Sequence, residues 1–199
     1  MQRIALLLVI SILYGCIGVN AHVVIKADGS GTMVLEYTVG KSVESLGRQD
    51  GNASQPPIAI AKRDFQRTVS RIPGLKLQSF KTKTTARDVI TTVRLAFKNR
   101  EAFINFFNAQ GSRAYFTENN QLNLLFTEGI NPIDPELYEA LRTVSDGYTV
   151  TMSFSLPASA TLRLVRGADT PETVTTGTNV SFTLPLLDML SGVQAELTW

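Results

Sequence analysis

Cysteine and histidine, the side chains that most often carry nucleophilic and metal chemistry, occur once each in this chain. Cys16 lies directly after an apolar stretch near the N-terminus, and His22 follows six residues later. One histidine and one cysteine at the start of the chain do not assemble Ser-His-Asp or Cys-His machinery. GxSxG, P-loop and GxGxxG motifs are also missing. The sequence therefore predicts no enzyme, no catalytic residues, no cofactor and no metal centre.

Carboxylate pairs are the remaining chemistry, because two acids suffice for glycoside hydrolysis. The candidate pairs are Glu101 with Glu118 and Glu136 with Glu139. Such positions are typical of charges on helix surfaces and at strand ends, so a carboxylate-dependent hydrolase is only a minor alternative. Residues 28–31, DGSG, offer too few oxygens for calcium, which needs six to eight, and they favour a tight hairpin turn.

Export explains the position of Cys16. An uncharged apolar run of 11 residues, IALLLVISILY, has the length of a signal-peptide core and is too short to span a bilayer. Residues 13–16, LYGC, fit the pattern at which bacterial lipoprotein precursors are cut and acylated, with fatty acids such as palmitate, on the cysteine. A competing signal-peptidase site ends at Ala21 and would release a soluble chain starting at His22. The lone cysteine favours a lipid anchor on Cys16, and both sites lie within a leader of residues 1–21.

Charge is unevenly distributed along the chain. Residues 62–100 contain eleven Lys and Arg but only two Asp, although the whole chain has 19 basic and 17 acidic residues. Arg63, Arg67 and Arg71 recur at every fourth position, on the helix face opposite the apolar residues. Because basic amphipathic helices bind anionic membranes, these arginines are predicted to contact anionic headgroups; a solvated face paired with acids elsewhere is the alternative. Nucleic acid is not a predicted partner, since the chain is exported and lacks interleaved exposed aromatics.

The elements that must position these residues are mostly strands, because polar and apolar residues alternate over much of the chain. Hairpins are predicted at 22–39 and 113–127, and alternating strands at 75–80, 89–97, 148–156, 162–164, 180–184 and 193–199. Helices are predicted at 58–72, from Asn99 to Gln110, and at 134–147. This pattern predicts one α+β domain over residues 22–199, an antiparallel sheet of about nine strands with about three helices packed on it.

The chain resembles the LppM family of bacterial lipoproteins. The resemblance rests on the export signal with Cys16, the opening hairpin with its DGSG turn, and the closing strands between Pro157 and Trp199. It implies a curved sheet whose helices enclose an apolar cavity that binds envelope lipid or glycolipid. It supplies no catalytic residues. The C-terminal membrane helix of the family has no counterpart before Trp199, so a second attachment is not expected from this sequence.

Together these observations predict a non-enzymatic protein of the bacterial cell envelope, held at the membrane by acyl chains. Its apolar ligand is expected on the helix that carries Phe103, Phe106 and Phe107. The alternative is a periplasmic or surface protein-interaction domain that uses a sheet edge or the polar segment 40–57, in an anchored or soluble form.

Overall fold

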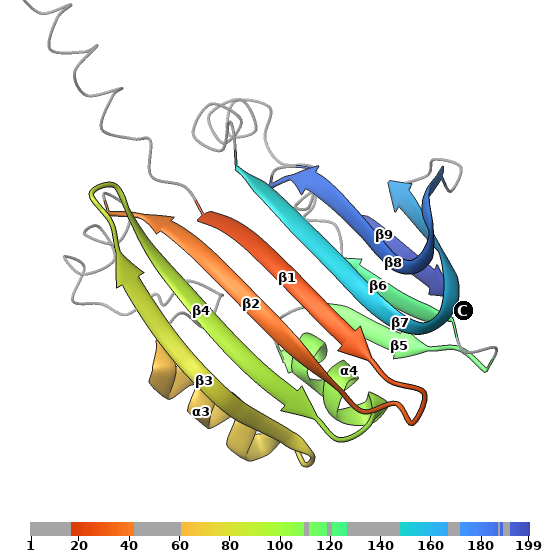
Figure 1. Ribbon diagram of the computed structural model, residues 1–199, viewed down its shortest axis with the longest axis horizontal. Helices are drawn as coiled ribbons and strands as arrows, with labels where there is room; N and C mark the ends of the chain where they lie inside the picture. Colours follow the sequence, from red (N-terminus) through yellow and green to blue (C-terminus); the bar gives the residue numbers. More distant parts are fainter. Residues whose placement is uncertain are drawn as a thin grey trace, which may run out of the picture.

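The computed structural model of the protein describes residues 17–41, 61–109, 112–118, 121–126, 148–166, 172–186, 188 and 192–199. Within them, nine strands form one sheet and two helices pack against it (Figure 1). None of the helices in these ranges is long and apolar enough to cross a membrane.

Chain order places the elements as follows. The strands are β1 (Ile17–Ile25), β2 (Gly31–Gly40), β3 (Leu75–Thr84), β4 (Asp88–Phe97), β5 (Arg113–Phe116), β6 (Leu122–Phe126), β7 (Thr149–Arg166), β8 (Glu172–Pro185) and β9 (Val193–Thr198). The helices are α3 (Lys62–Arg71) and α4 (Arg100–Ala109). The strand order across the sheet is β3-β4-β2-β1-β7-β9-β6-β5, with β8 paired to β7.

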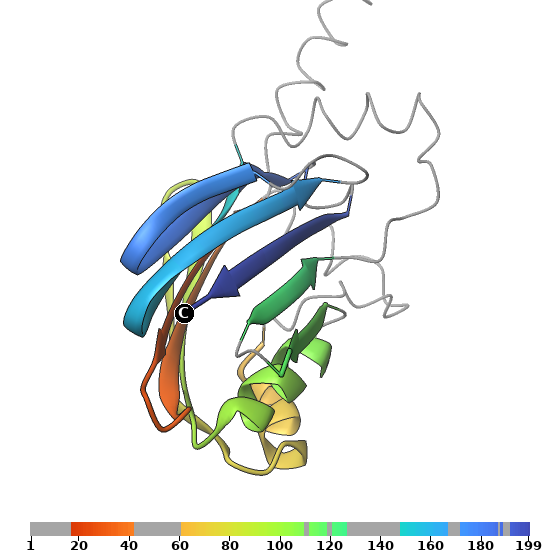
Figure 2. The same ribbon diagram turned by 90° about the vertical axis from the view of Figure 1, so that its right-hand side faces the viewer.

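The sheet curls because β7 bends, and the parts before and after the bend pair with different strands. Residues 149–155 of β7 pair with β8, and residues 150–155 also pair with β1, whereas residues 161–166 pair with β9. The β7–β8 register breaks between Ser155 and Ala160, and the ribbon bends there. Figures 1 and 2 show the resulting half-barrel, with both helices on its concave side. The bend is what turns a wide sheet into an enclosure.

The opening hairpin is confirmed. The Asp28 carboxylate accepts hydrogen bonds from the Ser30 amide (2.9 Å) and the Ser30 hydroxyl (2.7 Å), which lower the pKa of Asp28. Gly29 has a φ of 77°, in the left-handed region that glycine adopts without strain. A Cβ atom at Gly31 would collide with the Val24 carbonyl oxygen and the Phe97 ring. The DGSG run is therefore a structural turn, as predicted.

The predicted fold class, an antiparallel α+β sheet with about three helices, is wrong. Strands dominate the described residues, which contain two helices of ten residues each. β1 also runs parallel to β7, with Val19 opposite Val150. One-sided alternation usually indicates antiparallel pairing, but it reports burial rather than strand direction, and the elements between β1 and β7 provide the long connection a parallel pair needs. The third predicted helix, 134–147, lies outside the described residues.

Several strand boundaries differ from the prediction: β3 continues to Thr84, β8 begins at Glu172, and the predicted strands 148–156 and 162–164 are one strand, β7. β7 does not end at Pro157 but continues to Arg166, because this proline falls in the register break, where no ladder hydrogen bond needs its missing amide. β1 begins at Ile17, five residues before the predicted strand start at His22. The predicted leader of residues 1–21 includes the first five residues of β1, so the alternation of apolar and polar residues after it gives a strand start that is too late.

The helices cover the concave face. The α3 prediction is confirmed over Lys62–Arg71, and the Asn99 side chain caps α4 by accepting a hydrogen bond from the Ala102 amide (2.9 Å). Phe65 of α3 is fully buried against the rings of Tyr37 (6.2 Å between centroids) and Phe80 (6.0 Å), and burial raises the pKa of Tyr37. The single apolar core thus lies inside the curl.

Candidate functional site

Cys16, the predicted lipidation site, lies outside the described residues, but its neighbour Ile17 is the first residue of β1. The strand is paired from this first residue, with Ile17 opposite Val39 and Val19 opposite both Tyr37 and Val150. Ala21 is only 6% exposed. The fold therefore begins one peptide bond after the cysteine, without a spacer.

The competing cleavage site falls inside this strand. A cut after Ala21 would remove five of the nine residues of β1, which lies between β2 and β7. The removed segment pairs with residues 35–39 of β2 and residues 150–152 of β7. Backbone groups of both neighbouring strands would lose their partners, so a chain that starts at His22 keeps only part of the central ladder.

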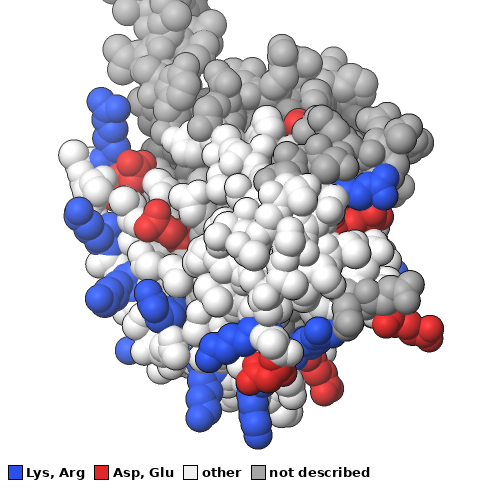
Figure 3. Space-filling view, turned by 45° about the vertical axis from the view of Figure 1, so that its right-hand side comes forward, with Lys and Arg blue, Asp and Glu red and all other residues white. Residues whose placement is uncertain are grey.

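The three predicted headgroup contacts lie together on α3. Arg63, Arg67 and Arg71 are all exposed, on the helix face opposite the buried Phe65. α3 contacts β3, the edge strand of the path, whose Lys76, Lys81 and Lys83 are exposed. Figure 3 shows Lys and Arg gathered along one side and one end of the molecule. The fold thus exposes the basic residues of this segment both on α3 and on β3.

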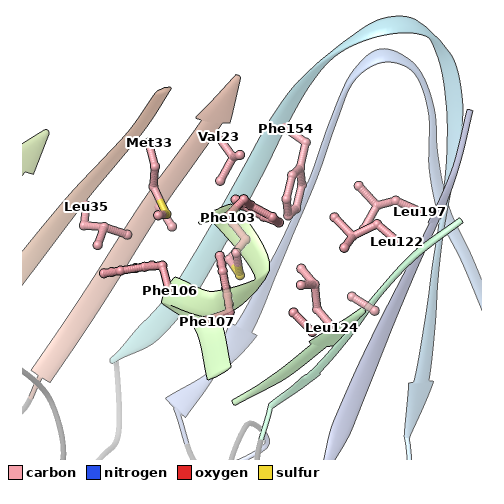
Figure 4. Close-up of a cluster of buried hydrophobic side chains, with 14 of the residues drawn as sticks. Val23, Met33, Leu35, Phe103, Phe106, Phe107, Leu122, Leu124, Phe154 and Leu197 are labelled. Atoms are coloured by element: carbon pink, nitrogen blue, oxygen red, sulfur yellow. The ribbon is translucent and has the colours of Figure 1, made fainter. Parts of the chain in front are cut away.

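The three phenylalanines predicted to hold an apolar ligand lie in the core. Phe103 is 0%, Phe106 3% and Phe107 8% exposed. Phe103 packs on Phe107, with ring centroids 4.9 Å apart, and on Phe97 at 5.2 Å. Figure 4 shows the three rings between the strands on either side of the curl. In this conformation they contact protein side chains, so a ligand would have to share or replace those contacts.

A serine–histidine contact was not foreseen from the sequence. His22 Nδ1 lies 2.8 Å from Ser153 Oγ across the parallel β1–β7 pair, and that hydroxyl donates to the Ala21 carbonyl at 3.3 Å. Because the two residues are 131 positions apart, no local signal announces the contact. His22 is exposed on the outer face of the sheet. The hydroxyl has one proton and two acceptors within reach, the imidazole Nδ1 at 2.8 Å and the Ala21 carbonyl oxygen at 3.3 Å, so this contact by itself assigns no nucleophile.

Hydroxyl and amide side chains continue this outer face over β7 and β8. Thr151 and Thr183 are hydrogen-bonded at 2.9 Å, and the Ser155 hydroxyl donates to the Asn179 side-chain carbonyl at 2.7 Å. No group of three or more potential metal ligands occurs among the described residues. Residues 149–155 of β7 and 179–183 of β8 include no charged side chain, and Figure 3 shows a broad area without Lys, Arg, Asp or Glu.

Aromatic residues gather where α4 meets the C-terminal strand. The Arg100 guanidinium lies 4.8 Å from the Phe116 ring centroid and 6.0 Å from that of Trp199. Phe116 and Trp199 also contact edge to face at 5.9 Å. The arginine packs on aromatic faces, an arrangement that is worth about 1 kcal/mol at partly exposed sites.

Comparison with known proteins gives a distant match. No family model matches the chain, and no curated protein matches it. Among solved structures, the NMR structure of the folded domain of LppM from Mycobacterium tuberculosis is similar, with 11% identity and a TM-score of 0.48 over 92% of this chain and 90% of that chain. This structural neighbour is an LppM domain, from the family that the sequence was expected to resemble.

Proposed function

We propose that the protein is an exported, non-enzymatic protein of the bacterial cell envelope, held at the membrane by acyl chains on Cys16, and that it binds lipid or glycolipid. The anchor and the ligand are separate parts of this proposal. Each is supported by a different observation and is tested by its own experiment.

The first residues of β1 support the proposal that the protein is anchored through Cys16. Two processing sites were open from the sequence, and only cleavage before Cys16 leaves the whole of β1 on the mature chain. Cleavage after Ala21 leaves four of the nine strand residues and removes a side chain that is buried in the core. Selection for a folded exported domain therefore favours the upstream site, at which the new N-terminus is the acylated cysteine.

Mass spectrometry of the mature protein tests the anchor. The protein should be expressed with its own leader in a bacterium and recovered from the membrane fraction. The N-terminal peptide is expected to begin at Cys16 and to carry the added mass of a diacylglyceryl group and a fatty acid. A Cys16→Ser variant should accumulate without this mass. An unmodified chain that begins at His22 would contradict the proposal.

The curled sheet and α4 support the ligand part. Phe103, Phe106 and Phe107 project from one helix into a continuous apolar interior. α4 lies between the two sides of the curl, so displacement of this helix would give an acyl chain a way into the interior. A lipid there would exchange ring-to-ring contacts for ring-to-chain contacts.

Native mass spectrometry of the mature chain tests the ligand. We expect a discrete additional mass, beyond the N-terminal acyl groups, that organic extraction removes. Phe107→Leu should lower its occupancy, whereas Phe65→Leu on α3 is a matched control that also removes a buried ring. Equal occupancy in both variants would separate the ligand from α4, and a clean apo mass after incubation with envelope lipids would exclude lipid binding.

A protein-interaction domain is the second candidate, and β8 favours it. Among the described residues β8 pairs only with β7, and residues 173–185 contain no charged side chain. Edge strands commonly carry charges that prevent pairing with another chain, so an uncharged edge is suited to accept a partner strand. Thr176→Lys with Ser181→Lys should abolish a stoichiometric partner if this edge binds one, and should leave lipid adducts unchanged.

A further inference from the structure

One end of the sheet lies next to the proposed anchor. Ile17 is opposite Val39, the penultimate residue of β2, and Gly40 is opposite Asp88, the first residue of β4. The Lys41 amide donates to the Arg87 carbonyl at 2.9 Å. Figure 1 shows the start of β1 and the turn between β3 and β4 at the same end of the sheet. Residues of this turn therefore lie level with the first residue after Cys16.

Three exposed cations occupy this end, and we call them the anchor-side rim: Lys41, Lys83 and Arg87. Lys83 is opposite Ile90, one position inward from Val89 at the strand end. The acid described in the same turn is Asp88, which is half-buried and whose carbonyl accepts a hydrogen bond from the Thr85 amide at 2.8 Å. The rim is thus a small cationic surface beside the anchor.

We propose that the anchored domain stands upright on the membrane, with the strands of β1 and β2 along the membrane normal and the anchor-side rim against anionic lipid headgroups. This inference rests on acylation of Cys16. One peptide bond joins the acylated Cys16 to a paired strand residue, so their Cα atoms are about 4 Å apart and the rim cannot move away from the bilayer unless the whole domain turns. Neighbouring strands are about 4.8 Å apart, which puts Lys41 and Arg87 within about 10 Å of the anchor laterally.

The same geometry places Arg71, the last arginine of α3, away from the rim. Phe65 contacts Tyr37, which lies two positions inward from Val39, and α3 runs from there toward the start of β3 at the opposite end of the sheet. Arg71 lies eight residues after Arg63, about 12 Å farther along the helix axis. Since the Debye length is about 8 Å at physiological salt, Arg71 adds little attraction in the upright orientation.

The opposite end supplies matched controls. Lys26, Lys76 and Lys98 are exposed there, and the Lys98 amide donates to the Gly74 carbonyl at 2.8 Å at the start of β3. The nine residues of β1 make this end about 26 Å distant from the anchor, roughly three Debye lengths. Three cations at each end allow a comparison at equal change of charge.

Fluorescence quenching of the mature acylated protein tests the orientation. The chain has one cysteine, so after acylation an introduced cysteine is the only free thiol. A dye is placed at Thr84→Cys on the rim side or at Ala27→Cys in the far turn, both exposed positions. The vesicles contain phosphatidylglycerol, phosphatidylcholine and a lipid with a nitroxide on its headgroup. Thr84 dye should be quenched and Ala27 dye should not.

Charge removal then tests the headgroup contact. Replacing Lys41, Lys83 and Arg87 by serine should lower the docked-to-undocked ratio about fivefold per residue, about a hundredfold in all, and relieve quenching at Thr84. The Lys26, Lys76 and Lys98 triple should leave it unchanged. Quenching at Ala27 equal to that at Thr84 would overturn the upright orientation, and an unaffected rim triple would overturn the headgroup contact. A mature protein whose mass includes no acyl groups would instead contradict the anchor on Cys16, on which this inference rests.

Discussion

Two neighbouring parts of the sheet, called below the charged half and the uncharged half, have similar inner faces and different outer faces. In the half formed by β2, β4 and β3, the outer surface carries charges such as Glu36, Arg94 and Lys81. In the half formed by β1, β8 and the first part of β7, the outer rows are Asn, Ser, Thr, His and Val, and the sequence has no Lys, Arg, Asp or Glu in residues 17–25, 149–162 or 173–187. Both halves bury mainly apolar side chains on the concave side, and Thr91 of β4 is the buried polar residue of the charged half among the described residues.

Burial explains why the inner faces of the two halves are alike, but it places no such demand on their outer faces. Every strand of the curl must remove one face from water, which costs free energy unless that face is apolar. No such demand acts on the outer surface. The exposed charges of one half and the hydroxyl and amide side chains of the other therefore give the two outer faces different electrostatic character. The most informative experiments change one half and leave its counterpart intact.

Truncation of β1, the strand of the uncharged half that pairs with β2 of the charged half, is expected to have the largest effect. A chain that starts at His22 loses five ladder residues from β2 and three from β7, together with the buried Ala21. At about 1 kcal/mol net for each lost backbone hydrogen bond, the free energy of unfolding should fall on the order of 5 kcal/mol, close to the whole stability of many domains. Urea unfolding against a chain that starts at Ile17 measures it.

The same experiment separates the two processing sites. If the His22 chain unfolds at the same urea concentration as the Ile17 chain, then the first half of β1 is dispensable and the argument against cleavage after Ala21 fails. Loss of the cooperative transition in the shorter chain would leave cleavage before Cys16 as the route to a folded domain.

Core truncation should affect the two halves equally. Phe65 packs under the charged half and is 0% exposed, whereas Phe154 lies on the inner face of the uncharged half and is 1% exposed. Phe65→Ala and Phe154→Ala should each lower the free energy of unfolding by about 3–5 kcal/mol, through lost burial and an unfilled cavity. Denaturant melts of both variants at low and high salt provide the measurement. A loss in one half only would show that the halves unfold separately.

Local signals account for what could be predicted from the sequence. The DGSG turn, the Asn99 cap of α4 and the hairpin of β5 and β6 each depend on residues a few positions apart, and each is confirmed. The apolar periodicity also placed the three phenylalanines of α4 on one helix, although their part in ligand binding stays a prediction.

Contacts between distant residues could not be predicted. Local patterns treat distant segments independently, so they cannot give the parallel pairing of β1 with β7 or the Ser153–His22 contact. The bend between Ser155 and Ala160 is a break in the pairing of β7 with β8, which also depends on a distant strand. The basic segment of the sequence similarly indicated a helical stripe, whereas the register of β1 points to three cations that are scattered in sequence, Lys41, Lys83 and Arg87. Strand pairing puts these cations at the same end of the sheet as Ile17, the residue after Cys16.

The smallest expected effect concerns the outer face of the uncharged half. Thr151 and Thr183 are directly opposite on β7 and β8, and their hydroxyls are 2.9 Å apart. A double-mutant cycle with Thr151→Val and Thr183→Val should give a coupling of about 0.2–1 kcal/mol, because a cross-strand hydroxyl pair at the surface exchanges with water at little cost. Since neither residue is charged, the coupling should be the same at low and high salt.

A double-mutant cycle between Lys81 and Arg94, on adjacent strands of the charged half, should instead show a repulsion that salt removes. Equal salt dependence in the two cycles would contradict the division of the outer face into a charged and an uncharged half.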